Sequence, residues 1–147
     1  MSYDLLVFAP EHAPTEREAF LAWWDRQAEW SEDHDYENPG VSTPALRAWF
    51  MEMIEAFPQM NGPYAPEELP EDDSAVTDYS IGRESIYAAF AWSKVEQAYN
   101  RVFALAGKHK VGFFDASSET SAVWLPDGSG GLKLAHEGTA QGREGDA

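Results

Sequence analysis

The sequence contains no cysteine, few cationic residues and no long apolar run. Without cysteine there is neither a disulfide framework nor a thiolate metal site. No apolar stretch approaches the roughly 18 to 20 residues that cross a bilayer. The first residues, MSYDLLVFAP, lack the basic start and long apolar stretch of a signal peptide. Together these absences predict a cytoplasmic protein that does not bind membranes.

Motifs for nucleotide, metal and nucleophile chemistry are also missing. There is no P-loop, no G-x-G-x-x-G, no EF-hand loop, no H-E-x-x-H and no G-x-S-x-G elbow. The four histidines are far apart in the sequence, so only folding could gather them. The sequence therefore predicts no cofactor, no metal and no catalytic residues, and it favours a protein that is not an enzyme.

The charge is large, negative and unevenly distributed. The chain has 147 residues, 44% of them hydrophobic, which suffices for one core despite the formal net charge of −16. Residues 1–82 hold 18 acidic and 3 basic residues, whereas residues 83–147 hold 8 and 7. A field of this sign repels nucleic acids and attracts basic proteins. The alternative is that the acidic surface only keeps the protein soluble.

Apolar spacing and turn residues predict one α+β domain over residues 1–126. Its elements follow the order β-α-α-β-β-α-β-β. Three segments are predicted helices, namely 13–30, 43–57 and 93–110. The strands are predicted at 3–10, in 75–92 on either side of Gly82–Arg83, at 111–117 and at 121–126. This order is typical of a two-layer domain, with an antiparallel or mixed sheet of about five strands and three helices on one face. The Gly-rich residues 127–147 are predicted to be a flexible tail.

The predicted helix ends rest on capping residues. Thr15 with Glu18, and Ser93 with Glu96, have capping-box spacing. Thr43 and Pro44 are typical of an N-cap and a first helical turn. Gly107 is predicted to end the third helix.

Two acidic segments are the main candidate for a binding surface. The stretch EWSEDHDYENPG holds five carboxylates and one histidine, and EELPEDD holds five more carboxylates. If these two segments converge in space, they form one electronegative face that binds a basic protein, for example a toxin domain. Trp24 or Trp30 is predicted to be its exposed apolar anchor, whereas Trp23, Trp49, Trp92 and Trp124 are expected to fill the core. The predicted acidic contact residues are Glu29, Glu32, Asp33, Asp35, Glu37, Glu67, Glu68, Glu71, Asp72 and Asp73.

Two alternatives stay open at this point. The first is an enzyme or ligand-binding cleft near Asp78, Tyr79, Arg83 and Asp115, because three of these residues flank a predicted hairpin and the fourth follows a predicted strand. A simpler interpretation of the hairpin residues is a local turn with an Arg–carboxylate pair. The second alternative is a divalent-metal site around His34, although adjacent loop residues do not wrap one ion.

Several stretches resemble a family of small, acidic, uncharacterised bacterial proteins. They are YDLLVF, WSEDHDY, TPALRAWF, TDYSIGR with IYAAFAW, and GFFD, and the resemblance spans residues 3 to about 126. It implies no established activity or site. In size, acidity and lack of cofactor motifs, the chain is also similar to immunity proteins that neutralise basic bacterial toxins. That similarity implies inhibition by occlusion, which requires no chemistry.

Overall fold

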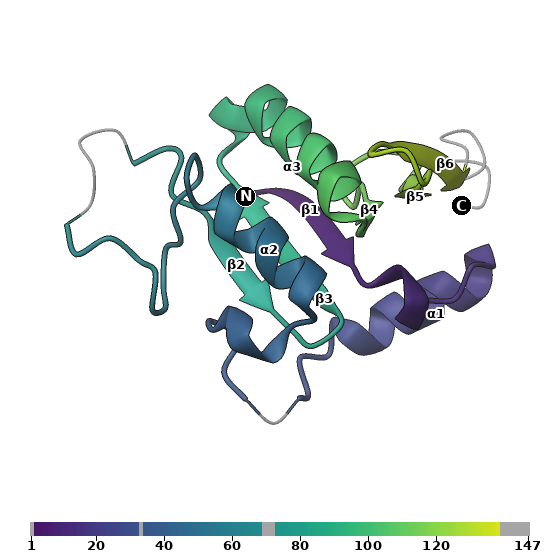
Figure 1. Cartoon of the computed structure of the whole chain (residues 1–147), viewed down its shortest axis with the longest axis horizontal. Helices are drawn as coiled ribbons and strands as arrows, with labels where there is room; N and C mark the ends of the chain where they lie inside the picture. The colour runs from purple at the N-terminus through teal and green to yellow at the C-terminus, as the bar shows by residue number, and fades with distance from the viewer. Residues whose placement is uncertain (1, 33, 69–72, 139–147) are drawn as a thin grey trace.

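A six-stranded antiparallel sheet is the centre of the structure over residues 2–32, 34–68 and 73–138, the part of the chain that this computed structural model describes (Figure 1). The strand order is β2-β3-β1-β4-β5-β6. The strands are β1 (Tyr3–Phe8), β2 (Asp78–Ile81), β3 (Ser85–Phe90), β4 (Gly112–Phe114), β5 (Val123–Pro126) and β6 (Leu132–His136). The helices are α1 (Arg17–Gln27), α2 (Pro44–Met53) and α3 (Val95–His109). The predicted α+β class and the order of the first eight elements are confirmed, and β6 is an additional strand.

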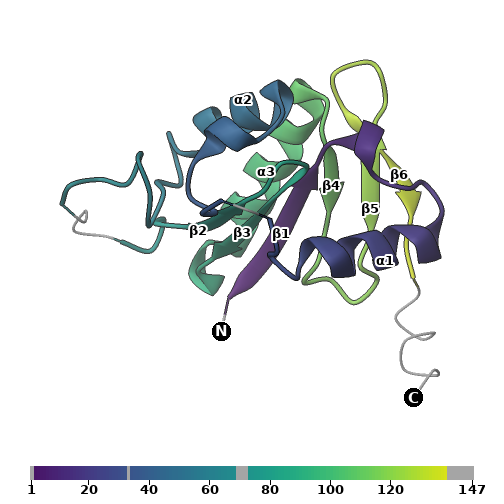
Figure 2. The same cartoon turned by 90° about the horizontal axis from the view of Figure 1, so that it is seen from below.

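Helices cover both faces of the sheet, not one face as predicted. In β1, Leu5 and Val7 point into the core beneath α2 and α3, while Leu6 and Phe8 point into a second cluster with α1. Figure 2 shows α2 and α1 on opposite sides of the sheet. Successive residues of a strand point to opposite faces. The unbroken apolar run LLVF therefore requires cover on both sides, and α1 provides the second layer.

Strand β6 lies within the segment that was predicted to be a flexible tail. It pairs antiparallel with β5, from Val123 opposite His136 to Pro126 opposite Leu132. The turn between β5 and β6 packs on α3 at Gly107, where an added Cβ would lie 2.8 Å from the Gly130 carbonyl oxygen. Gly107 is therefore a point of close packing within α3, not its end. Residues 139–147, the rest of the predicted tail, lie outside the described residues.

Capping confirms one predicted helix start and corrects two. The Thr43 side chain accepts a hydrogen bond from Leu46 N, and Pro44 begins α2, as predicted. At α1 the cap is Glu16, whose carboxylate accepts from Glu18 N and Ala19 N, in place of Thr15. A 3₁₀ turn at Trp92–Lys94 precedes α3, so the predicted Ser93 capping box does not form. Helix α3 ends at Lys110, which has left-handed backbone geometry with φ of 62°.

Candidate functional site

The first acidic loop, residues 28–42, is attached to the hairpin of β2 and β3. Ile81 N donates a hydrogen bond of 2.8 Å to the Tyr36 carbonyl, and Arg83 N donates one of 3.0 Å to Glu32 Oε1. Glu32 N in turn donates to the Tyr36 hydroxyl at 2.6 Å. The loop therefore covers one end of the outer edge of β2, and the Glu32 carboxylate is engaged within the protein.

The second acidic loop, described at residues 58–68 and 73–77, closes on itself just before β2. Thr77 N donates to the Pro58 carbonyl at 2.8 Å, and Met60 N donates to the Thr77 carbonyl at 2.9 Å. The side chain of Gln59 is fully buried and joins the two loops, because its Nε2 donates to the Glu37 carbonyl at 2.7 Å. Gln59 Oε1 accepts from Tyr64 N, which is a hydrogen bond within the second loop. Gln59 thus joins the start of the second loop, ahead of the EELPEDD segment, to the first acidic loop.

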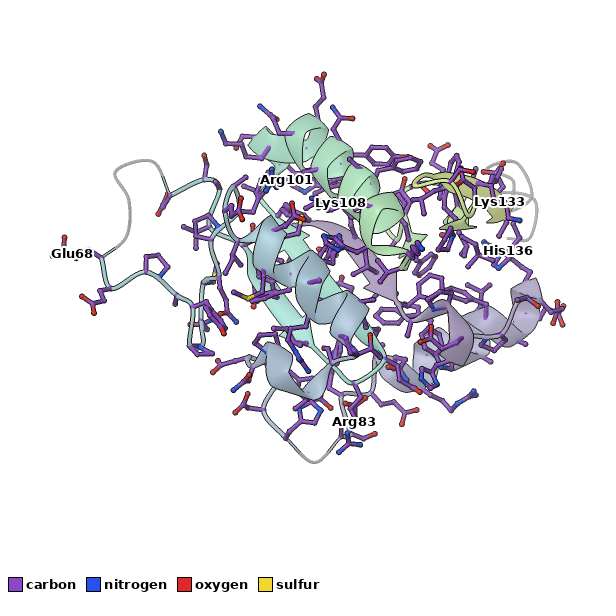
Figure 3. The ribbon with its side chains drawn as sticks, in the orientation of Figure 1. Glu68, Arg83, Arg101, Lys108, Lys133 and His136 are labelled. Carbon is purple, nitrogen blue, oxygen red and sulfur yellow. The ribbon has the colours of Figure 1, made fainter. Side chains whose placement is uncertain are left out.

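The exposed carboxylates of the two acidic loops and of β2 form a set that we call the acidic edge. Between Arg26 and Arg83 the sequence contains one Lys or Arg, namely Arg47. Figure 3 shows Glu68 far from the labelled cations of α3 and β6. The predicted residues Asp33, Glu71 and Asp72 lie outside the described part of the chain. The acidic edge comprises Glu29, Asp35, Glu37, Glu67, Glu68, Asp73 and Asp78.

An open groove of about 560 Å³ lies at the end of the acidic edge. Asp73 and Asp78 contribute carboxylates to it, and Met60, Val76 and Phe90 contribute apolar surface. Neither Lys nor Arg is among the described residues that line it. Such a lining suits a long cationic side chain, whose aliphatic stem packs on apolar atoms while its charged end faces the carboxylates.

The cations of α3 are partly paired within the protein. Glu52 of α2 accepts from Lys108 Nζ at 2.6 Å and from His109 Nε2 at 2.8 Å. Lys108 first, and then His109, lower the pKa of Glu52. Figure 3 shows Arg101 and Lys108 on the α3 side of the molecule. These contacts join α2 to α3. Arg47 and Arg83 lie beside the first acidic loop, where Arg47 donates to the Gly40 and Ser42 carbonyls and Arg83 N donates to Glu32.

The predicted aromatic anchors, Trp24 and Trp30, are not freely exposed. Trp24 stacks on Tyr87 with centroids 5.7 Å apart and an interplanar angle of 6°. Trp30 packs edge-on against Trp24, Tyr36 and Tyr87 and holds the first acidic loop to the sheet. The most exposed large apolar side chains are Trp92, at 48%, and Met60, at 46%. Trp92 was expected in the core, and Met60, at the rim of the groove, was not predicted at all.

The four residues of the predicted alternative cleft do not meet. Tyr79 is buried beneath α2 and donates its hydroxyl to the Phe57 carbonyl at 2.8 Å. Asp78 lies at one end of the β2–β3 hairpin and Arg83 in the turn at the other. Asp115 follows β4, and β3 and β1 separate that strand from β2. Of these four residues, Asp78 belongs to the groove, and Asp115 has separate surroundings that are described below.

His34 closes the first acidic loop in its charged form. Its Nδ1 faces the Asp35 carbonyl, and its Nε2 lies 2.5 Å from Glu32 Oε1. Because both ring nitrogens face acceptors, the imidazolium fits best. The Asp35 carbonyl first, and then Glu32, raise the pKa of His34. Among the described residues no three His, Asp or Glu side chains are placed to hold a metal ion.

We expect Glu32→Gln to lower the pKa of His34, because it removes a charged acceptor from Nε2. Since the folded pKa is raised, the stabilisation from this pair is fully present below pH 6.5, the ordinary value for histidine. It is lost as the pH rises through the raised pKa. Titration of the His34 ring by NMR measures the change. The exposed Glu29→Gln serves as the control, and an identical His34 titration in both variants would contradict the pairing.

Comparisons with known proteins identify no relative. No protein-family model, no curated protein and no solved structure matches the chain. No described helix is long and apolar enough to span a membrane. The fold itself defines only the structural class, which is α+β.

Proposed function

We propose that this protein binds a basic protein through its acidic edge. The observation that carries the proposal is the hydrogen bonding of the first acidic loop to β2 at Ile81 and, through Gln59, to the second loop. Asp73 of the second loop and Asp78 of β2 line one groove, and the exposed Glu37 belongs to the first loop, which Gln59 joins to the second. Such a surface attracts and orients a cationic partner, and it occupies a basic cleft by shape and charge alone.

The groove gives this surface a point of specific contact. A Lys or Arg side chain of the partner would enter it, with its charged end between Asp73 and Asp78 and its stem against Val76 and Phe90. Met60 supplies the exposed apolar contact, in the role that was predicted for Trp24 or Trp30. More specifically, the protein would be an immunity-like inhibitor that occludes the basic active-site cleft of its partner and catalyses no reaction itself.

Matched charge reversals test the proposal. The partner is captured from lysate of the source cell at low salt, identified, purified and titrated by calorimetry. We expect Glu37→Lys, Asp73→Lys and Asp78→Lys together to weaken binding at least about tenfold and to reduce its dependence on salt. The control variant reverses three exposed carboxylates away from the edge, namely Glu11, Asp25 and Glu96.

Both variants change the net charge by the same amount. Equal weakening by the two would show that overall charge, and not the acidic edge, governs binding. Unchanged binding of the edge variant at low salt would also refute the proposal.

A further inference from the structure

Asp115 is a half-buried carboxylate with an unpaired oxygen. It follows β4, where Phe113 points toward α3 and Phe114 toward α1, so the alternation returns Asp115 to the α3 side. Its backbone is fixed, because Asp115 N donates to the Ala122 carbonyl at 2.9 Å and its own carbonyl accepts from Ser118. The side-chain Oδ1 is buried and has no hydrogen-bond partner.

Tyr3 and Tyr99 lie within electrostatic range of this carboxylate, and the ring of each packs against another aromatic ring. The Tyr3 ring lies 5.2 Å from the Trp92 ring, with an interplanar angle of 51°. Tyr99 of α3 packs against Phe113 at 5.4 Å. Burial first, and then the Asp115 carboxylate, raise the pKa of both the Tyr3 and the Tyr99 phenol. The exposed Trp92 packs beside Tyr3, so an aromatic surface that solvent reaches lies next to one of these two tyrosines.

The surroundings of Asp115 are complementary to an organic cation. Burial raises the pKa of Asp115 to about 6, so at neutral pH the group is mostly ionised. An ionised oxygen that is buried without a donor is unfavourable, and a cation would satisfy it. Aromatic rings also attract cations through their faces. Calcium requires six to eight oxygen ligands, and one carboxylate does not supply them.

We propose that Asp115, Tyr3, Trp92 and Tyr99 form a binding site for an alkylammonium group. The charged nitrogen would pair with Asp115, and the attached carbons would contact the rings of Tyr3 and Trp92. Two sources carry this chemistry, a small free amine and the lysine side chain of another protein. The site uses the carboxylate of Asp115, whereas the groove of the acidic edge uses Asp73 and Asp78, so the two proposals are tested with different variants.

The test uses butylammonium and the blocked amino acid acetyl-lysine-methylamide, with butanol as the uncharged isostere of the first. Each is titrated into the full-length protein while the Trp92 indole N–H and the Asp115 amide are followed by NMR. We expect saturable shifts with the two cations and none with butanol. Shifts with both cations would show that a lysine side chain fits the site, whereas shifts with butylammonium alone would restrict the ligand to small amines.

Variants and pH provide the second readout. Asp115→Asn should lower the affinity for butylammonium at least about tenfold, and Trp92→Ala should lower it about threefold. The exposed Asp25→Asn should leave the affinity unchanged. The titratable groups facing Asp115 are Tyr3 of β1 and Tyr99 of α3, and neither loses its proton below pH 8. Affinity should therefore fall about tenfold between pH 7 and pH 5 as Asp115 takes up a proton. Absence of saturable shifts, or shifts that persist in Asp115→Asn, would overturn the proposal.

Discussion

Replacement of Gly112 by alanine should destabilise the fold by about 3 kcal/mol, within the range for overpacking of a well-filled core. Gly112 lies directly opposite Phe8 where β4 pairs with β1. A Cβ at this position would lie closer than 3.0 Å to three carbon atoms of the Phe8 ring. The ring is fully buried and packs against Phe20 and Trp23, at 5.2 and 5.9 Å between centroids, so it has little room to move.

Chemical denaturation of a double-mutant cycle measures this effect. Phe8→Leu alone removes core contacts and should cost about 1–2 kcal/mol. In the Gly112→Ala background, Phe8→Leu should destabilise the protein much less, or even stabilise it, because the smaller side chain makes room for the new methyl group. A coupling of at least about 1 kcal/mol is expected. Strict additivity of the two substitutions would show that Phe8 is not what Gly112 accommodates.

Asp115→Asn should stabilise the protein at pH 7 by about 1–2 kcal/mol. Burial raises the pKa of Asp115 from 3.8 to about 6. For a fully buried group, this rise in pKa corresponds to a loss of about 3 kcal/mol of folding stability at pH 7. The partial exposure of Asp115 to water reduces that loss. The neutral amide occupies the same space without a charge. Thermal and urea denaturation at several pH values measure the difference between the variant and the natural protein.

The pH dependence distinguishes this effect from a general change in packing. The folded protein holds the Asp115 proton more tightly than the unfolded chain does. The natural protein therefore loses stability as the pH rises from about 4 through 6. The variant should lack this loss, so the two proteins should be equally stable below pH 4 and diverge above it. The exposed Asp25→Asn should show no such divergence, and a gain that is constant from pH 4 to pH 8 would contradict the assignment.

Local sequence signals determined most of the elements and their order. Thr43 and Pro44 fix the start of α2 because an N-cap and a first-turn proline act within one helical turn. Likewise, Gly82 and Arg83 separate two β-forming runs that can pair only as a hairpin. The two acidic segments were also visible in the sequence, since charge composition needs no structure to be counted.

The tertiary structure decided the arrangement of these elements and the content of the sites. The apolar run LLVF in β1 indicates that both faces of the sheet are covered, but only the fold shows that α1 covers the second face. Residues 132–136 carry no strong strand pattern and form β6 because β5 offers them a free edge. The contact between the two acidic loops is made by the buried side chain of Gln59. The surroundings of Asp115 include Tyr3, which is more than one hundred positions away in the sequence. Such contacts arise from long-range packing, which local periodicity does not encode, so the sequence indicated acidic chemistry while the fold determined where that chemistry is presented.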